Sequence, residues 1–204
     1  MKDYAFFLSH RGERVIMKDF FERYSYQSVH FLLNQVAIGL FGVVLSLAAG
    51  MAENDGLKIV TSIFAVLFFL FLQFAAAWKV GAEDRVSVDL GKRQKDIFLP
   101  VKMWALANSV NYLLAIIITV ANVFPSEGFM ATVGAIASTI TLIIEGMFTG
   151  LISFSVGGQP LNSYWFIYFL MPLPSLLAIV AAYFCGLNNI NFGGLFSGNA
   201  GGKK

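Results

Sequence analysis

Glu145 has the most unusual chemistry in this sequence, because it is the only charged side chain between Glu127 and Lys203. The residues around it are too apolar for a segment that lies in water. A carboxylate inside a bilayer costs at least ~2.5 kcal/mol, so such a group persists only with a partner, a proton to hold or a chemical role. The sequence therefore predicts that Glu145 either ties helices together or handles a proton or cation.

A second feature lies in the next apolar run, which contains Pro172 and Pro174. Each proline lacks an N–H and clashes with the carbonyl four residues earlier, so the carbonyls of Tyr168 and Leu170 lose their helical donors. If the two spans fold back as a hairpin, Glu145 comes level with this break. Many transporters build a proton or cation site from a broken helix and a buried carboxylate at one depth.

The alternative is a purely structural contact. A protonated Glu145 can donate a hydrogen bond to the freed carbonyl of Tyr168, or to Asn108 or Asn111, which lie three residues apart on one face of the preceding span. Interhelical contacts of this kind average only ~0.6 kcal/mol, which is enough to favour one register. We favour this structural interpretation over the proton or cation site.

The composition determines what positions these residues. The chain has 204 residues, of which 57% are hydrophobic and 13% are charged, whereas soluble domains are about 45–50% apolar and about 25% charged. The apolar residues form long runs that predict membrane spans. We therefore predict an all-α, polytopic transmembrane helical bundle in residues 29–187, with spans at about 29–51, 59–78, 103–124, 129–154 and 164–187.

The segments outside these spans give the orientation. Residues 1–28 predict an amphipathic helix, which lies either in the cytoplasmic interface or in solvent, packed on the protein's own loops. Residues 79–102 predict a basic loop, and 188–204 a flexible Gly- and Asn-rich tail. Lys and Arg are concentrated in the N-terminal region and in loop 79–102, so the positive-inside rule places both in the cytoplasm. Five spans put the C-terminus outside. A re-entrant or broken segment would instead give four spans and a cytoplasmic C-terminus.

Small residues four positions apart let two helices approach closely. Two such pairs predict helix packing: Ser46 with Gly50 in the first span, and Gly146 with Gly150 in the fourth. They suggest that the protein packs against itself or against another membrane protein.

A basic cluster in loop 79–102, formed by Lys92, Arg93 and Lys95, is a predicted contact for anionic lipid headgroups. Each basic residue near such a surface contributes roughly 1 kcal/mol. The same cluster also serves as an ordinary topology determinant, which is the interpretation we favour. The net charge of +2 gives no indication of nucleic-acid binding.

The remaining reactive residue types are scarce. One cysteine, Cys185, and two histidines, His10 and His30, predict no metal site and no cofactor. Glu145 has no second acid or base in the spans to work with, so we expect no enzyme.

The predicted function is a non-enzymatic membrane subunit or scaffold in a plasma or bacterial inner membrane. The alternative is a small-solute or ion transporter, or a channel component, that uses Glu145 and the proline break. A third hypothesis, lipid or peptide sensing, rests on the N-terminal helix alone.

Overall fold

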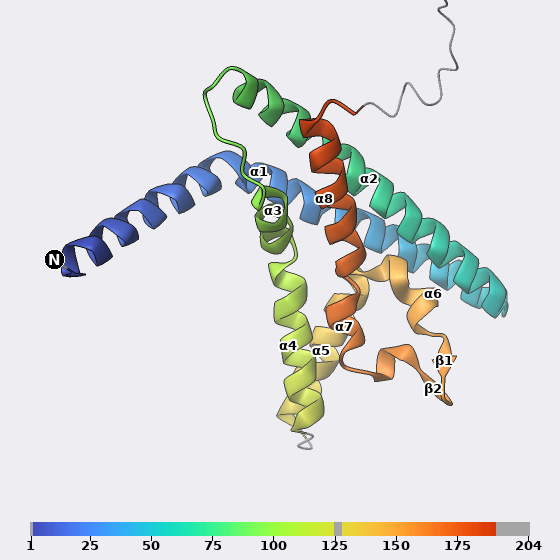
Figure 1. Ribbon diagram of the computed structural model, residues 1–204. Helices are drawn as coiled ribbons and strands as arrows, with labels where there is room; N and C mark the ends of the chain where they lie inside the picture. The colour runs from blue at the N-terminus through green and yellow to red at the C-terminus, as the bar shows by residue number, and fades with distance from the viewer. Residues whose placement is uncertain (1, 125–127, 191–204) are drawn as a thin grey trace, which may run out of the picture.

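Two long helices form the body of the molecule (Figure 1). The computed structural model describes residues 2–124 and 128–190, with side chains from residue 20 onward. Helix α1 (Lys2–Met51) continues without interruption from the predicted interfacial segment into the first apolar run. Helix α2 (Asp55–Asp89) runs back beside it. Asn54 caps α2, because its Oδ1 accepts a hydrogen bond from the Leu57 N–H at 3.0 Å.

Helix α2 continues well beyond Lys79, into the segment predicted as a loop. The helix ends at Asp89, and Gly91, two residues later, has a φ of +68°. The Lys92 N–H donates to the Ser87 carbonyl at 3.0 Å and the Gly91 N–H to the Val88 carbonyl at 2.9 Å, a Schellman motif that needs a left-handed residue at Gly91. The connection to the next helix is therefore shorter than the predicted loop, because a charged boundary residue does not end a helix.

The third predicted span is a bent pair, α3 (Leu99–Ala107) and α4 (Ser109–Val123), with an angle of 54° between them. The bend lies at Asn108, whose side-chain amide donates to the Trp104 carbonyl at 3.0 Å. Such a side-chain bond competes with the helical pattern of backbone bonds. The span is therefore present but not straight.

The fourth predicted span is broken more sharply. Helix α5 (Phe129–Ile144) ends at Glu145, and the chain continues as the short 3₁₀ helix η1 (Gly146–Phe148) and helix α6 (Thr149–Ile152) at 86° to α5. In Figure 1, α5 rises to this corner and α6 descends from it. The expected continuous helix over 129–154 is thus replaced by two helices that meet at Glu145.

A two-stranded hairpin follows, with β1 (Ser155–Val156) paired antiparallel to β2 (Gln159–Pro160). Its turn residues, Gly157 and Gly158, both have positive φ values, as a two-residue hairpin of this hand requires. The 3₁₀ helix η2 (Leu161–Ser163) then leads to the last helices.

Helices α7 (Ile167–Leu170) and α8 (Leu173–Leu187) form the fifth predicted span, with Pro172 as the residue that caps α8. Helix α8 lies against α2. A Cβ at Gly186 would collide with the Trp78 carbonyl, and one at Gly81 with the Tyr183 carbonyl. Two glycines thus let these helix backbones approach each other closely.

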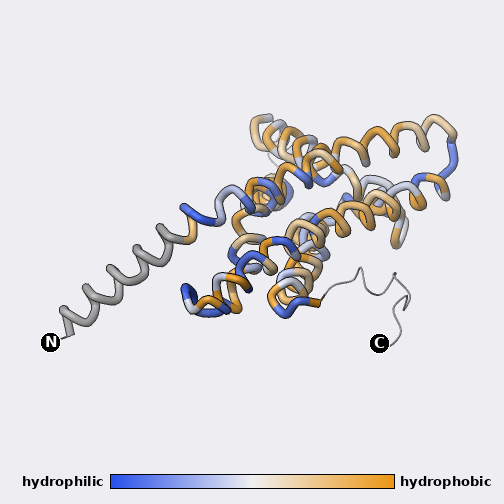
Figure 2. The backbone as a smooth tube through the Cα atoms, turned by 90° about the horizontal axis from the view of Figure 1, so that it is seen from above, coloured by the Kyte–Doolittle hydropathy of each residue, from blue (hydrophilic) through white to orange (hydrophobic). Residues whose placement is uncertain are grey.

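Among the described residues, three helices are long and apolar enough to cross a membrane: Phe20–Met51, Asp55–Asp89 and Ile167–Leu187. Counting each bent pair as one span raises the number to five. Figure 2 shows hydrophobic residues along most of these helices and hydrophilic residues at the turn between α1 and α2. The molecule is all-α apart from the small hairpin, and its helices are compatible with a membrane protein.

The contacts also show which helix ends lie together. The start of the apolar part of α1, the end of α2 and the end of α8 meet where Tyr24 and Tyr183 hydrogen-bond to Asp84. The segment α5–η1–α6 instead reaches inward to Glu145 and then turns to the start of α2, where the Gly150 N–H donates to Ser62 Oγ at 2.8 Å. This path fits either a broken span or a re-entrant loop.

Candidate functional site

Glu145 lies in the interior of the molecule, at the corner between α5 and η1. Its exposed fraction is 1%, and its backbone ends the helix, because its N–H donates to the Thr141 carbonyl at 2.7 Å while its own carbonyl accepts from the Phe148 N–H at 2.9 Å. The residues that follow it, from Gly146 to Phe148, are all buried. The carboxyl therefore stands at a break in the helix and away from bulk water.

The hydrogen-bond partner of Glu145 comes from α1. Gln35 Nε2 donates to Glu145 Oε1 at 2.8 Å, and Gln35 is itself 1% exposed. The second carboxyl oxygen, Oε2, is buried without a hydrogen-bond partner. Because an unsatisfied buried carboxyl oxygen is costly, this atom is where a proton, a water molecule or a small cation would be stabilised.

Close backbone contact holds this corner against α1 and α2. A Cβ at Gly39 of α1 would collide with the carbonyl oxygens of Ile143 and Ile144, and one at Gly146 would collide with the Gly39 carbonyl. A Cβ at Gly150 would collide with the Lys58 carbonyl of α2. Gly146 and Gly150 thus lie at helix contacts within the chain, where small residues were expected.

The other predicted packing pair lies elsewhere. Gly50 faces no backbone, since a Cβ there would meet only Lys58 Cε at 3.8 Å. Ser46 is half-buried on α1. The close approach on α1 takes place at Gly39 and Gly42 instead, because the corner at Glu145 meets the middle of this helix and not its end.

Asn108 and Asn111 are both buried and bond to each other, Asn111 Nδ2 donating to Asn108 Oδ1 at 3.0 Å. Neither is hydrogen-bonded to Glu145, and Asn111 Oδ1 is buried without a partner. The amide of Gln73 in α2 donates to the Phe31 carbonyl at 3.0 Å, and its Oε1 is likewise unpartnered. The interior thus holds several buried oxygens that lack a donor.

The proline break lies where the sequence predicts it. The carbonyl of Pro172 accepts from Ser175 Oγ at 2.7 Å and from Trp104 Nε1 at 3.3 Å, so neighbouring side chains satisfy it. The Tyr168 hydroxyl donates to the Asn162 carbonyl at 3.1 Å. Leu170 ends α7, and Pro174 lies in the first turn of α8, a position that proline tolerates.

The predicted pairing of Glu145 with this break differs from the structure. The carboxyl bonds to Gln35 and not to the Tyr168 carbonyl, Asn108 or Asn111. The physical reason is the 86° turn at Glu145, which directs α6 toward α2, so that the fourth and fifth spans do not form a simple hairpin. The two breaks nevertheless share one apolar cluster, in which Ile144 and Met147 lie with Tyr168 and Met171.

A second buried charge, Asp84, connects the helix ends. It is 5% exposed, and Tyr24 donates to its Oδ1 at 2.7 Å and to Oδ2 at 2.9 Å, while the Tyr183 hydroxyl donates to Oδ2 at 3.1 Å. Arg93 Nη1 lies 3.2 Å from Oδ1. Burial acts to lower the pKa of Arg93, but the hydrogen bond to Tyr24 and the charge of Asp84 outweigh it, so the pKa is raised and the guanidinium stays charged.

Arg93, one of the three residues predicted to contact lipid headgroups, is thus held against Asp84, with its guanidinium also 5.1 Å from the Tyr24 ring centroid. Lys95 lies 5.9 Å from the ring centroid of Phe184. Lys92 is exposed beyond the end of α2. The predicted cluster is therefore divided among different neighbours.

Two of these hydrogen-bonding residues, Gln35 and Asp84, were not predicted from the sequence. Gln35 and Asn34 are the only side-chain amides of the first span, which is a usable signal for a buried polar contact. Asp84 stands among other charges, and only its helical spacing from the buried residues Gln73, Ala77 and Gly81 distinguishes it. That signal depends on knowing that α2 continues past Lys79.

The carboxyl group of Glu145 can bind a proton or a cation and can form hydrogen bonds. Among the side chains that the structure describes, no group of three or more His, Cys, Asp or Glu residues is arranged to hold a metal ion. Comparison with known proteins yields no match to a family model, a curated protein or a solved structure.

Proposed function

We propose that the protein is a non-enzymatic subunit or scaffold of a plasma or bacterial inner membrane that packs against a second copy of itself. The observation that carries this proposal is the hairpin of α4 and α5, which extends away from the α1–α2 body in Figure 1. With 15 and 16 residues, these helices are about 22–24 Å long at 1.5 Å per residue. Because α3 precedes α4 in the same bent span, only α5 ends short of a hydrocarbon core of about 30 Å.

Short helices in a bilayer are accommodated by local thinning or by association with other helices. The outer surface of the α4–α5 hairpin is almost entirely apolar and uncovered. Its exposed large side chains are Val110, Leu113, Ile116, Val120, Val123, Phe124, Phe129, Ile136, Ile140 and Ile143. A second copy would cover this surface and shield the thin part of the membrane, which supports association through the hairpin.

The interior supports a structural role as well. Its buried polar groups connect different helices: Gln35 with Glu145, Gln73 with the Phe31 carbonyl, Ser62 with the Gly150 N–H, and Trp104 with Ser175. Contacts of this kind favour one arrangement of the helices over others. They fit a protein whose role is to hold a defined shape in the membrane.

Crosslinking tests the association. In a Cys185→Ser background, Ile136→Cys on α5 should form a disulfide-linked dimer in native membranes, because Ile136 is 55% exposed on the hairpin. Leu177→Cys on α8 is the matched control, since Leu177 is 73% exposed on another surface. The measurement is the fraction of dimer after mild oxidation, and we expect dimer for Ile136→Cys alone. Dimer at Leu177→Cys but not at Ile136→Cys would reject the hairpin as the interface. Co-purification of a different membrane protein with this chain would show that it associates with a partner and not with a second copy.

We infer further that the chain crosses the membrane four times and that α5–η1–α6 is re-entrant. The contacts of Asp84 with Tyr24 and Tyr183, and the hydrogen bond from Trp78 Nε1 to the Ile190 carbonyl at 2.9 Å, support a common side for the N-terminal region and the end of α8. The positive-inside rule makes that side cytoplasmic.

Cysteine labelling tests this topology. In the Cys185→Ser background, Lys92→Cys and Asn188→Cys should react with an impermeant maleimide from the cytoplasmic side, and Asn54→Cys from the opposite side. All three positions are exposed, so a difference in their labelling would reflect the side of the membrane and not burial. Labelling of Asn188→Cys from the same side as Asn54→Cys would instead establish an odd number of crossings.

A second candidate function is proton or monovalent-cation transport through Glu145. One observation favours it: the unpartnered Oε2 lies at a sharp helix break in the interior. Broken helices that present carbonyls and a carboxyl at one depth form such sites in transporters. Its test is Glu145→Gln, which keeps the shape of the side chain and removes the titratable carboxyl group.

A further inference from the structure

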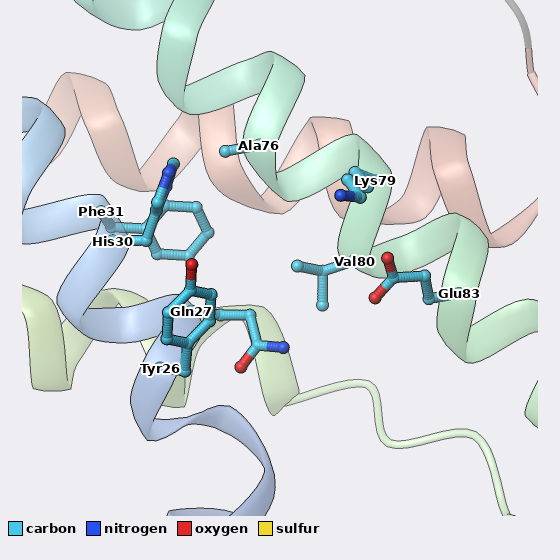
Figure 3. A pocket seen from close by; sticks show the side chains of 8 residues that line it. All are labelled: Tyr26, Gln27, His30, Phe31, Ala76, Lys79, Val80 and Glu83. Atoms are coloured by element: carbon cyan, nitrogen blue, oxygen red, sulfur yellow. The ribbon is translucent and has the colours of Figure 1, made fainter.

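A groove between α1 and α2 lies near the helix ends that meet at Asp84. It encloses a volume of about 210 Å³. Figure 3 shows Tyr26, Gln27 and His30 of α1 on one wall and Lys79 and Glu83 of α2 on the other. The volume lies below the ~300 Å³ of typical small-molecule pockets, so it suits a polar headgroup better than a whole metabolite.

The groove carries one charge of each sign. Lys79 and Glu83 are one helical turn apart and both exposed. Among the residues that the structure describes, neither of them forms a salt bridge. The groove therefore offers one ammonium group and one carboxylate to a ligand.

The position of the groove relates it to the membrane surface. Lys79 directly follows Trp78 at the end of the apolar run that starts after Lys58, and Trp followed by a basic residue is typical of a membrane–water boundary. On α2, the side chains at four-residue steps before Ala76 are Leu72, Phe68 and Phe64, and the last two stack with ring centroids 6.3 Å apart. An apolar stripe thus leads from the groove toward the other end of α2.

We propose that this groove binds the headgroup of one zwitterionic aminophospholipid. Lys79 pairs with the phosphate, Glu83 receives the ammonium group, and an acyl chain follows the stripe of Leu72, Phe68 and Phe64. The balanced charges of Lys79 and Glu83 favour a zwitterion over an anionic lipid. The cluster of Lys92, Arg93 and Lys95 is less suited, because Arg93 already pairs with Asp84.

Native mass spectrometry of the full chain, released from nanodiscs of phosphatidylethanolamine and phosphatidylglycerol, tests the proposal. The wild type should retain one phosphatidylethanolamine in preference to phosphatidylglycerol. Lys79→Gln and Glu83→Gln should each lower its retention about 10-fold, the effect of losing one charge-assisted contact. Lys92→Gln is the matched control, an exposed lysine near the same helix end, and should leave retention unchanged.

Three results would overturn the proposal. Equal losses for Lys92→Gln and Lys79→Gln would mean diffuse attraction to the membrane surface. Unchanged retention in Glu83→Gln would remove the ammonium contact, and retention of phosphatidylglycerol at the level of phosphatidylethanolamine would exclude selection of a zwitterion. Thermal unfolding of each variant accompanies the measurement, and because Lys79 and Glu83 are exposed, we expect the variants to unfold like the wild type.

Discussion

Asp84→Ala should destabilise the protein by about 3 kcal/mol or more, because it leaves two buried tyrosine hydroxyls and a guanidinium without their acceptor. Tyr24, Tyr183 and Arg93 all converge on this carboxylate, so a single substitution loosens α1, α2, α8 and the connection that follows α2. The free energy of unfolding in mixed detergent micelles measures the effect.

Asp96→Ala is the control for this prediction. Asp96 also pairs with a basic residue, Lys102, at 2.8 Å, but the side chains are 41% and 45% exposed. An exposed pair contributes less than about 1 kcal/mol, and the hydrogen bond that Asp96 Oδ1 accepts from the Phe98 N–H at 2.9 Å contributes about 1 kcal/mol, so Asp96→Ala should cost less than Asp84→Ala. If Asp84→Ala and Asp96→Ala destabilise equally, the buried contacts of Asp84 are not what holds these helix ends together.

Glu145 gives the second large effect, and two substitutions separate its structural and functional roles. Glu145→Leu leaves the buried Gln35 amide without its acceptor and should cost about 1–3 kcal/mol. Glu145→Gln keeps a carbonyl oxygen for the Gln35 Nε2 donor, so stability should stay close to that of the wild type. Replacing both partners, as Gln35→Leu with Glu145→Leu, removes the unpaired groups and should recover most of the loss.

Flux measurements decide whether the proton of Glu145 moves. In proteoliposomes with an imposed proton, sodium or potassium gradient, transport that depends on the carboxyl should be abolished in Glu145→Gln while the variant remains folded. A scaffold should instead give no specific flux in the wild type, with Glu145→Gln indistinguishable from it. Wild-type flux that survives Glu145→Gln would exclude Glu145 as the site.

Several elements follow from local rules, and the sequence predicts them. The apolar runs that end at Met51 and begin after Lys58 become α1 and α2, because their length and composition are set by residues next to one another. Pro172 and Pro174 interrupt the last span where proline chemistry demands it. Gly91 ends α2 through a left-handed conformation, a local effect that the predicted loop boundary at Lys79 overlooked.

The break at Glu145 is different, because no proline lies at this position, and Gly146 weakens a helix without requiring that it end. The helix ends there because α1 offers Gly39 and Gly42 for close backbone contact and Gln35 for the carboxyl. These residues are far from Glu145 in the chain, and the gain from their contacts exists only after the helices pack. Periodicity along one segment therefore predicts a straight span, and tertiary packing overrides it.

An all-α chain with long apolar helices and one conspicuous interior carboxyl can be predicted from the amino-acid sequence, because composition and run length depend only on the order of residues. Tertiary structure decided the partners: Gln35 for Glu145, and Tyr24, Tyr183 and Arg93 for Asp84. It also decided that Lys79 and Glu83 face a groove while Arg93 does not remain free. A polar side chain inside a helical bundle takes whichever partner the helix crossings bring within about 3 Å, and those crossings depend on all the helices at once.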